Sequence, residues 1–104
     1  MKASVDYLDY LKNRFLKDPE EAVGYLNACL DEEDPRVFLL ALKDVADAWG
    51  GISKLARVSR LHRVNLHRML SKKGNPEIHS LYRVLMTLGL RLQVASAKPL
   101  KKTA

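Results

Sequence analysis

The side chains that could perform molecular recognition are concentrated between positions 53 and 73, where arginine, asparagine, histidine and lysine recur. Arginine can pair bidentately with guanine and asparagine with adenine, whereas lysine attracts phosphate as a point charge. These residue types predict contacts with the base edges and phosphates of double-stranded DNA. The predicted DNA-binding residues are Ser53, Lys54, His62, Arg63, Val64, Asn65, His67, Arg68, Lys72 and Lys73.

The sequence contains no pattern typical of catalysis. We find no nucleophile paired with a base, no glycine-rich phosphate loop and no metal-binding signature. His62 and His67 are five positions apart, so they do not share one face of a helix, and Cys29 is remote from both. We therefore expect a binding protein rather than an enzyme, with no metal and no other cofactor.

Apolar spacing predicts a helix, a turn and a second helix between Gly51 and Lys73, the second helix beginning near His62. A DNA-binding helix-turn-helix needs a small residue within its first helix and apolar residues at fixed offsets across the turn. Ala56 is the small residue here. The same periodicity also fits a generic helical bundle. The predicted packing residues are Leu55, Ala56, Leu61, Leu66 and Met69.

Further helices are predicted on both sides of this segment. Asp18-Pro19, Asp34-Pro35 and Asn75-Pro76 each place an oxygen acceptor before a proline, the order typical of a helix N-terminus. Gly50-Gly51 and Gly89 are placed to end two of these helices. The chain is therefore expected to be an all-α, five-helix domain over residues 18–95, preceded by a helical extension over residues 1–17.

After Gly89 the apolar period changes from that of a helix to strict alternation. Leu90, Leu92 and Val94 alternate with other residues, which predicts a short strand with one buried face. A lone strand cannot satisfy its own backbone, so we expect it to pair with the same strand of a second copy. The alternative is a packed extended tail. Residues 96–104 lack periodicity and predict a flexible basic tail.

Charge is divided unevenly along the 104 residues. The chain has 18 basic and 12 acidic side chains, a net charge of +6; residues 1–50 hold 6 basic and 11 acidic, whereas residues 51–104 hold 12 basic and 1 acidic. A basic half favours a polyanionic partner, although it could also be a solvated face. The acidic half could face a basic partner protein. One cysteine and the absence of a long apolar run predict a cytoplasmic protein without membrane contact.

Most of the chain, from about Asp18 to Val94, resembles the probable addiction module antidote proteins, also described as HigA-like antitoxins or DNA-binding prophage proteins. The opening helix around Asp18-Pro19-Glu20-Glu21-Ala22 and the closing Leu88-Gly89-Leu90-Arg91-Leu92 are similar to this family. The most specific similarity lies in Gly50-Gly51-Ile52-Ser53-Lys54-Leu55-Ala56 and Ser71-Lys72-Lys73-Gly74-Asn75-Pro76.

The resemblance implies a Cro/repressor-type helix-turn-helix antitoxin that represses its own operon and neutralises a RelE-like toxin by direct binding. A homodimer on a roughly palindromic operator follows from this reading. Two residues depart from the family pattern: Arg60 replaces a turn glycine, and His62 replaces a capping serine. The main alternative is a stand-alone prophage-type transcriptional regulator without a toxin. A lesser alternative is a protein-interaction module whose basic face is only exposed to solvent and binds no nucleic acid.

Overall fold

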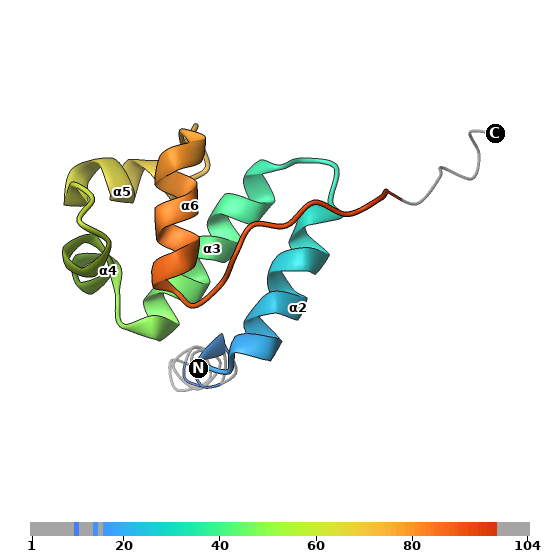
Figure 1. Ribbon diagram of the computed structural model, residues 1–104, viewed down its shortest axis with the longest axis horizontal. Helices are drawn as coiled ribbons and strands as arrows, with labels where there is room; N and C mark the ends of the chain where they lie inside the picture. The colour runs from blue at the N-terminus through green and yellow to red at the C-terminus, as the bar shows by residue number, and fades with distance from the viewer. Residues whose placement is uncertain (1–9, 11–13, 15, 98–104) are drawn as a thin grey trace, which may run out of the picture.

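The computed structural model describes residues 10, 14 and 16–97, and the part of the chain that it describes is helical (Figure 1). The all-α prediction is therefore confirmed for these residues. The predicted extension over residues 1–17 and the tail over residues 96–104 lie mostly outside them. The helices in chain order are α2 (Pro19–Leu30), α3 (Arg36–Trp49), α4 (Ile52–Ser59), α5 (Arg63–Met69) and α6 (Ile78–Thr87).

α2 begins at the predicted Asp18-Pro19 pair, whereas α3 begins one residue later than predicted, at Arg36, and its N-cap Pro35 makes no side-chain capping hydrogen bond. An aspartate side chain still contacts the first residues of each helix. Asp18 Oδ1 accepts a 3.0 Å hydrogen bond from the backbone N–H of Glu20. Asp34 Oδ1 accepts a 2.9 Å hydrogen bond from the backbone N–H of Arg36, whose guanidinium also pairs with the same carboxylate at 2.8 Å. Each bond satisfies an N–H that the first turn of a helix leaves without a partner.

The predicted start of the last helix at Asn75-Pro76 is wrong. α6 begins at Ile78, and Glu77 before it is extended, with φ −71° and ψ 150°. The preceding loop is constrained by Gly74, since a Cβ there would collide with the backbone carbonyl of Met69. The chain passes close to the end of α5 at Gly74, and the residues that follow connect it to α6 instead of forming its first turn.

The core lies between α3 and the three helices that follow it. Leu42, Leu55, Leu66, Leu70 and Val84 are its most deeply buried large side chains, each with 0% or 1% of its surface exposed. α2 covers the other side of α3 through Ala22 and Leu26, which belong to the same apolar cluster. The two helices are also joined by a 2.6 Å hydrogen bond from the Tyr25 hydroxyl to Asp44 Oδ2.

The predicted strand after Gly89 is absent from the described residues. Residues 90–97 form an irregular segment that crosses α3 and runs toward α2 (Figure 1). Leu90 donates a 2.8 Å hydrogen bond to the Leu85 carbonyl, but Leu92 and Val94 are 42% and 97% exposed. Alternation alone does not make a strand, because a ladder requires a second strand and the described chain contains none. The packed-tail alternative holds only for Leu90, which lies against the core, because residues 91–97 are exposed. No helix in the described ranges has the length and hydropathy needed to cross a membrane.

Candidate nucleic-acid interface

The candidate interface is the α4–α5 unit, which we define as residues 52–69. The residues expected to pack the two helices together are buried in it: Leu55 is 0%, Ala56 7%, Leu66 1% and Met69 7% exposed. Leu61, between the helices, is partly buried against the same core. α4 and α5 contact each other directly, and α4 also contacts α3 and α6. The unit is therefore held rigidly on the rest of the fold.

The turn between α4 and α5 depends on a left-handed arginine. Arg60 has φ 62° and ψ 35°, and among the described residues it is the one residue other than glycine with a positive φ. The backbone N–H groups of Arg60 and Leu61 both donate to the carbonyl of Ala56, which closes the end of α4. Arg60 thus adopts the conformation that glycine adopts without strain, at a cost of roughly 1–2 kcal/mol.

Arg83 of α6 supports this turn, and sequence reasoning missed it. Its Nη2 donates a 2.5 Å hydrogen bond to the backbone carbonyl of Ser59, the last residue of α4. The carbonyls in the last turn of a helix lack partners within the helix. Ser59 is 3% exposed, and its hydroxyl has no hydrogen-bond partner within the described structure. Arg83 and Ser59 are 24 positions apart, so no local pattern joins them.

The outward face of α5 contains most of the predicted DNA-binding residues. Arg63, Val64, His67 and Arg68 line one open hollow on the surface together with Ser71. Val64 is 55% exposed, so an apolar side chain is presented to the outside between the polar ones. The exposed residues of the helix and its N-cap are His62, Arg63, Val64, Asn65, His67 and Arg68.

His62 precedes α5 without capping it. Its backbone is extended, with φ −70° and ψ 130°, as is usual before a helix, but its side chain makes no capping hydrogen bond. The imidazole therefore does not replace the helix-capping hydrogen bond that a serine would make at this position. Its exposed side chain is left at the edge of the α5 surface.

The N-termini of α4 and α5 are joined by two predicted DNA-binding residues. Arg63 Nε donates a 2.9 Å hydrogen bond to the Ser53 hydroxyl. Next to Ser53, the Lys54 ammonium lies 4.5 Å from the centre of the Trp49 ring, a cation–π contact. Both cationic side chains are exposed and lie beside the start of a helix, where the backbone N–H groups also favour an anion.

Lys72 and Lys73 were expected on the second helix, and this placement is wrong. α5 ends at Met69, because Leu70 turns fully into the core and the Ser71 hydroxyl donates a 2.6 Å hydrogen bond to the Arg68 carbonyl. The two lysines lie in the loop that follows. The pKa of Asp34 is about 2, lowered mainly by hydrogen bonds from Arg36 and also by the charge of Lys72. Lys72 therefore lies close to the acidic residues between α2 and α3.

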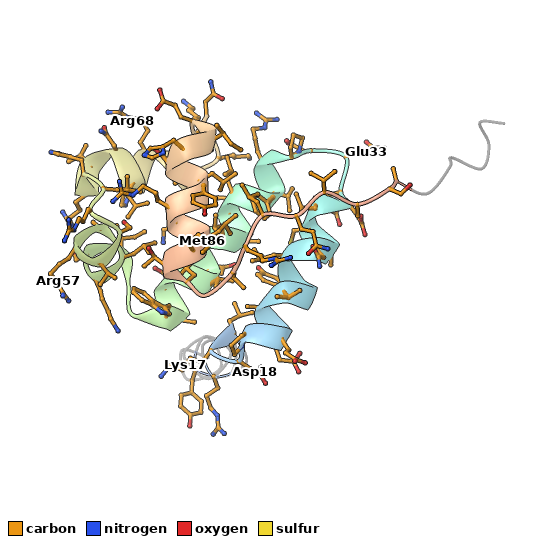
Figure 2. All side chains as sticks on the ribbon, in the orientation of Figure 1. Lys17, Asp18, Glu33, Arg57, Arg68 and Met86 are labelled. Carbon is orange, nitrogen blue, oxygen red and sulfur yellow. The ribbon has the colours of Figure 1, made fainter. Side chains whose placement is uncertain are left out.

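Arg57 and Arg68 project from α4 and α5 at one end of the molecule, whereas Glu33 lies at the opposite end, beyond α2 and α3 (Figure 2). The separation of charge is incomplete, because Arg36 pairs with Asp34 and Lys72 lies close to the same carboxylate. Arg57 and Arg60 are exposed on the α4–α5 unit but were not among the predicted residues. The spacing of Lys54 and Arg57 places them one turn apart on α4, a signal that could have identified Arg57.

The described side chains include few candidates for metal binding or thiol chemistry. Among these residues, no three of the types His, Cys, Asp and Glu are close enough together to hold a metal ion. Burial raises the pKa of the Cys29 thiol, with smaller contributions from Glu32 and Asp44. A raised pKa lowers the fraction of the reactive thiolate. The α4–α5 unit presents an exposed cationic surface.

An all-helical protein with an exposed cationic surface on two short packed helices is thus the class that the fold and the site define. Within this class, the chain belongs to the family described as "Probable addiction module antidote protein", which matches residues 4–96. An uncharacterized protein of Haemophilus influenzae is 35% identical over 83 residues, which cover 80% of this chain and 84% of that protein. No solved structure matches the chain. The family description assigns an antitoxin role and implies a toxin partner.

Proposed function

We propose that the protein is a sequence-specific DNA-binding antitoxin of a type II toxin–antitoxin module. It represses its own operon through the α4–α5 unit, a Cro/repressor-type helix-turn-helix as in HigA-like antitoxins, and it neutralises a RelE-like toxin by direct binding in the cytoplasm. It acts as a binding protein without catalytic activity. The observation that supports DNA binding best is the exposed set of Arg63, Asn65, His67 and Arg68 on one short, rigidly packed helix.

The roles of individual residues follow from their positions. Arg63, Asn65 and Arg68 reach base edges in the major groove from the exposed face of α5, because they can donate the hydrogen bonds that distinguish guanine and adenine. Ser53 and Lys54 bind a phosphate at the N-terminus of α4, which sets the register without reading sequence. Lys72 and Lys73 add phosphate contacts from the loop after α5.

Fluorescence anisotropy with two labelled duplexes of equal length tests the DNA proposal. One duplex spans the promoter of the protein's own operon, and the other is its scrambled sequence. We expect preferential binding of the promoter duplex and a steep decrease in affinity with added salt, because phosphate contacts release counterions. Equal affinity for the two duplexes would exclude sequence-specific repression.

The proposed toxin-binding surface is the acidic loop, residues 31–34. Asp31, Glu32 and Glu33 are exposed there, at the end of the molecule opposite Arg57 and Arg68 (Figure 2). A toxin that cleaves RNA must itself be basic, so a cationic surface on it would complement this loop. The surfaces for DNA and toxin would then adjoin at Lys72, which lies close to Asp34, while the base-reading residues of α5 lie farther away (Figure 2).

Charge reversal tests this surface. The double variant Glu32→Lys, Glu33→Lys is expected to weaken toxin binding and to flatten its salt dependence, because the attraction is electrostatic. The matched control is Glu20→Lys, Glu21→Lys, which changes the net charge equally at the other end of α2. Unchanged toxin binding in the first variant would remove the acidic loop from the interface. Failure of the adjacent gene's product to co-purify, together with no growth rescue, would favour the stand-alone regulator.

We propose further that the protein binds its operator as a homodimer. Two-fold symmetry would require two half-sites about one helical turn apart. Exposed apolar side chains support a partner copy: Val23 and Leu30 of α2 and Leu92 of the C-terminal segment line one groove, and they are 44%, 53% and 42% exposed. Sedimentation equilibrium tests the proposal, and a monomer at the concentration that saturates the operator would contradict it.

A further inference from the structure

Arg83 occupies an unusual place relative to the proposed DNA-binding surface. It belongs to α6, outside the α4–α5 unit, and its side chain spans the gap to the C-terminus of α4. The adjacent Val84 is 0% exposed and the following Leu85 is 5% exposed, so the backbone that holds Arg83 is anchored in the core. An immobile backbone allows a partly buried guanidinium to act as a fixed hydrogen-bond donor.

The acceptor of that hydrogen bond lies immediately before the strained residue of the turn. Nη2 of Arg83 donates to the Ser59 carbonyl at 2.5 Å, and the next residue is Arg60, with its positive φ of 62°. The peptide unit between Ser59 and Arg60 therefore has its carbonyl oriented by α6. Rotation of this peptide, which would release the left-handed conformation of Arg60, would break the bond to Arg83.

The orientation of this peptide determines where α5 begins. The N–H groups of Arg60 and Leu61 both reach back to Ala56, and α5 starts two residues after Leu61, at Arg63. A change at the turn would thus move the first turn of α5 relative to α4. It would also separate Arg63 from Ser53, whose hydrogen bond at 2.9 Å depends on the present placement of the two helices.

We propose that Arg83 is a positioning residue for DNA readout. Its hydrogen bond to the Ser59 carbonyl keeps Arg60 in the left-handed conformation and thereby fixes the direction in which α5 projects. This inference rests on the proposed function. Because it concerns the direction in which α5 projects, loss of Arg83 alters contacts to bases, which need accurate geometry, more than contacts to phosphates, which tolerate displacement.

The experiment compares Arg83→Met with Lys43→Met. Both substitutions remove one positive charge, but Lys43 lies on α3, outside the α4–α5 unit and the apolar groove, and its ammonium pairs with the exposed Asp47 of the same helix. We expect Arg83→Met to reduce the ratio of promoter to scrambled-duplex affinity at least tenfold, and Lys43→Met to leave this ratio unchanged. Addition of Arg60→Gly to Arg83→Met should restore part of the ratio, because glycine adopts a positive φ without support. An equal ratio for the two single variants would overturn the proposal.

A second measurement is independent of DNA. Amide hydrogen exchange at Leu61, whose N–H donates to Ala56 at 3.1 Å, should be at least tenfold faster in Arg83→Met than in Lys43→Met. If Arg83→Met fails to fold, the affinity ratio and the amide exchange of Leu61 are measured on Arg83→Lys instead. Wild-type values of both in Arg83→Lys would overturn the requirement for a guanidinium. If the wild-type protein does not prefer its promoter, the proposed function fails, whereas the exchange result still reports whether Arg83 holds the turn.

Discussion

Arg63, the first residue of α5, donates a 2.9 Å hydrogen bond to the hydroxyl of Ser53 near the start of α4. If the protein binds DNA as proposed, this bond orients the exposed guanidinium before the complex forms. A side chain that is already ordered loses less conformational entropy when it binds. Ser53 therefore has two roles in the proposed complex, as a phosphate ligand and as a support for Arg63.

The first prediction concerns this pair. Ser53→Ala should lower promoter affinity by about 0.5–1.5 kcal/mol, the usual contribution of one hydrogen bond. Its thermal stability should stay nearly unchanged, since both side chains are exposed. Anisotropy titration and a thermal melt measure the two quantities. Ser53→Thr, which keeps the hydroxyl, is the control; a loss of affinity as large as that of Ser53→Ala would contradict the role of the hydroxyl.

The second prediction separates base readout from phosphate attraction. Arg68→Ala should lose roughly 1–3 kcal/mol on the promoter and relax the base preference, whereas Lys73→Ala should weaken binding evenly and lower the salt slope by about 1. The reason is their placement: Arg68 lines the hollow on α5, and Lys73 lies in the loop beyond it. Titrations at several salt concentrations measure both effects. Equal losses on promoter and scrambled DNA for Arg68→Ala would remove it from base readout.

The third prediction concerns the strained turn. Arg60→Gly should raise the free energy of unfolding by up to about 1 kcal/mol, because relief of roughly 1–2 kcal/mol is partly offset by the greater freedom of glycine in the unfolded chain, about 0.5–1 kcal/mol. Urea denaturation measures the change. Arg60→Ala removes the same side chain but keeps the strain at φ 62°, so it should bring no gain. Equal stabilisation by both variants would show that the side chain, and not the backbone, is unfavourable.

The fourth prediction uses the link between α2 and α3. Burial, together with the hydrogen bond to Asp44 and its charge, raises the pKa of Tyr25 above its ordinary value of 10.0. Since the folded state favours the neutral phenol, its stabilisation is fully present below pH 10 and is lost as the pH rises above that value. Tyr25→Phe should cost about 1 kcal/mol at neutral pH, because Asp44 loses this hydrogen bond.

Urea denaturation at a series of pH values measures this effect. Wild type should lose stability above pH 10 more steeply than Tyr25→Phe, which lacks the group that ionises. Tyr82→Phe is the matched control, because Tyr82 is 49% exposed. Parallel curves for wild type and Tyr25→Phe would assign the alkaline transition to other groups.

The fifth prediction concerns two glycines of different type. Gly24 lies within α2, and a Cβ there would meet nothing within 4 Å, so Gly24→Ala should stabilise the protein by roughly 0.5–1 kcal/mol. Gly51 has equal space but a φ of 99°, so Gly51→Ala should destabilise it. Thermal melts compare the pair. The same sign of change for both variants would contradict the distinction between free space and backbone strain.

Local signals in the sequence predicted the helices well where one residue determines the outcome. Asp18 and Asp34 accept hydrogen bonds from the first turns of α2 and α3, and Gly89 follows the end of α6 with a φ of 82°. The sequence also indicated an unusual turn at position 60, because a residue that replaces a turn glycine must either adopt a positive φ or change the turn. Here Arg60 adopts it.

Features that depend on distant parts of the chain could not be predicted in this way. The contact of Arg83 with Ser59 joins α6 to α4, and nothing in the spacing of either residue indicates it. The true start of α6 depends on the close approach of Gly74 to Met69, which places Asn75 in a loop despite its favourable order with proline. Lys73 was assigned to a helix because apolar spacing does not reveal where Leu70 turns inward.

Trp49 is the one tryptophan in the chain, and the ammonium of Lys54 lies 4.5 Å from the centre of its ring. Indole emission responds to a charge so close to the ring. If a phosphate draws Lys54 away when DNA binds, the intrinsic fluorescence of the unlabelled protein should change as the duplex is added. The cation–π contact would then act as a built-in optical reporter at the edge of the surface where the interaction is proposed.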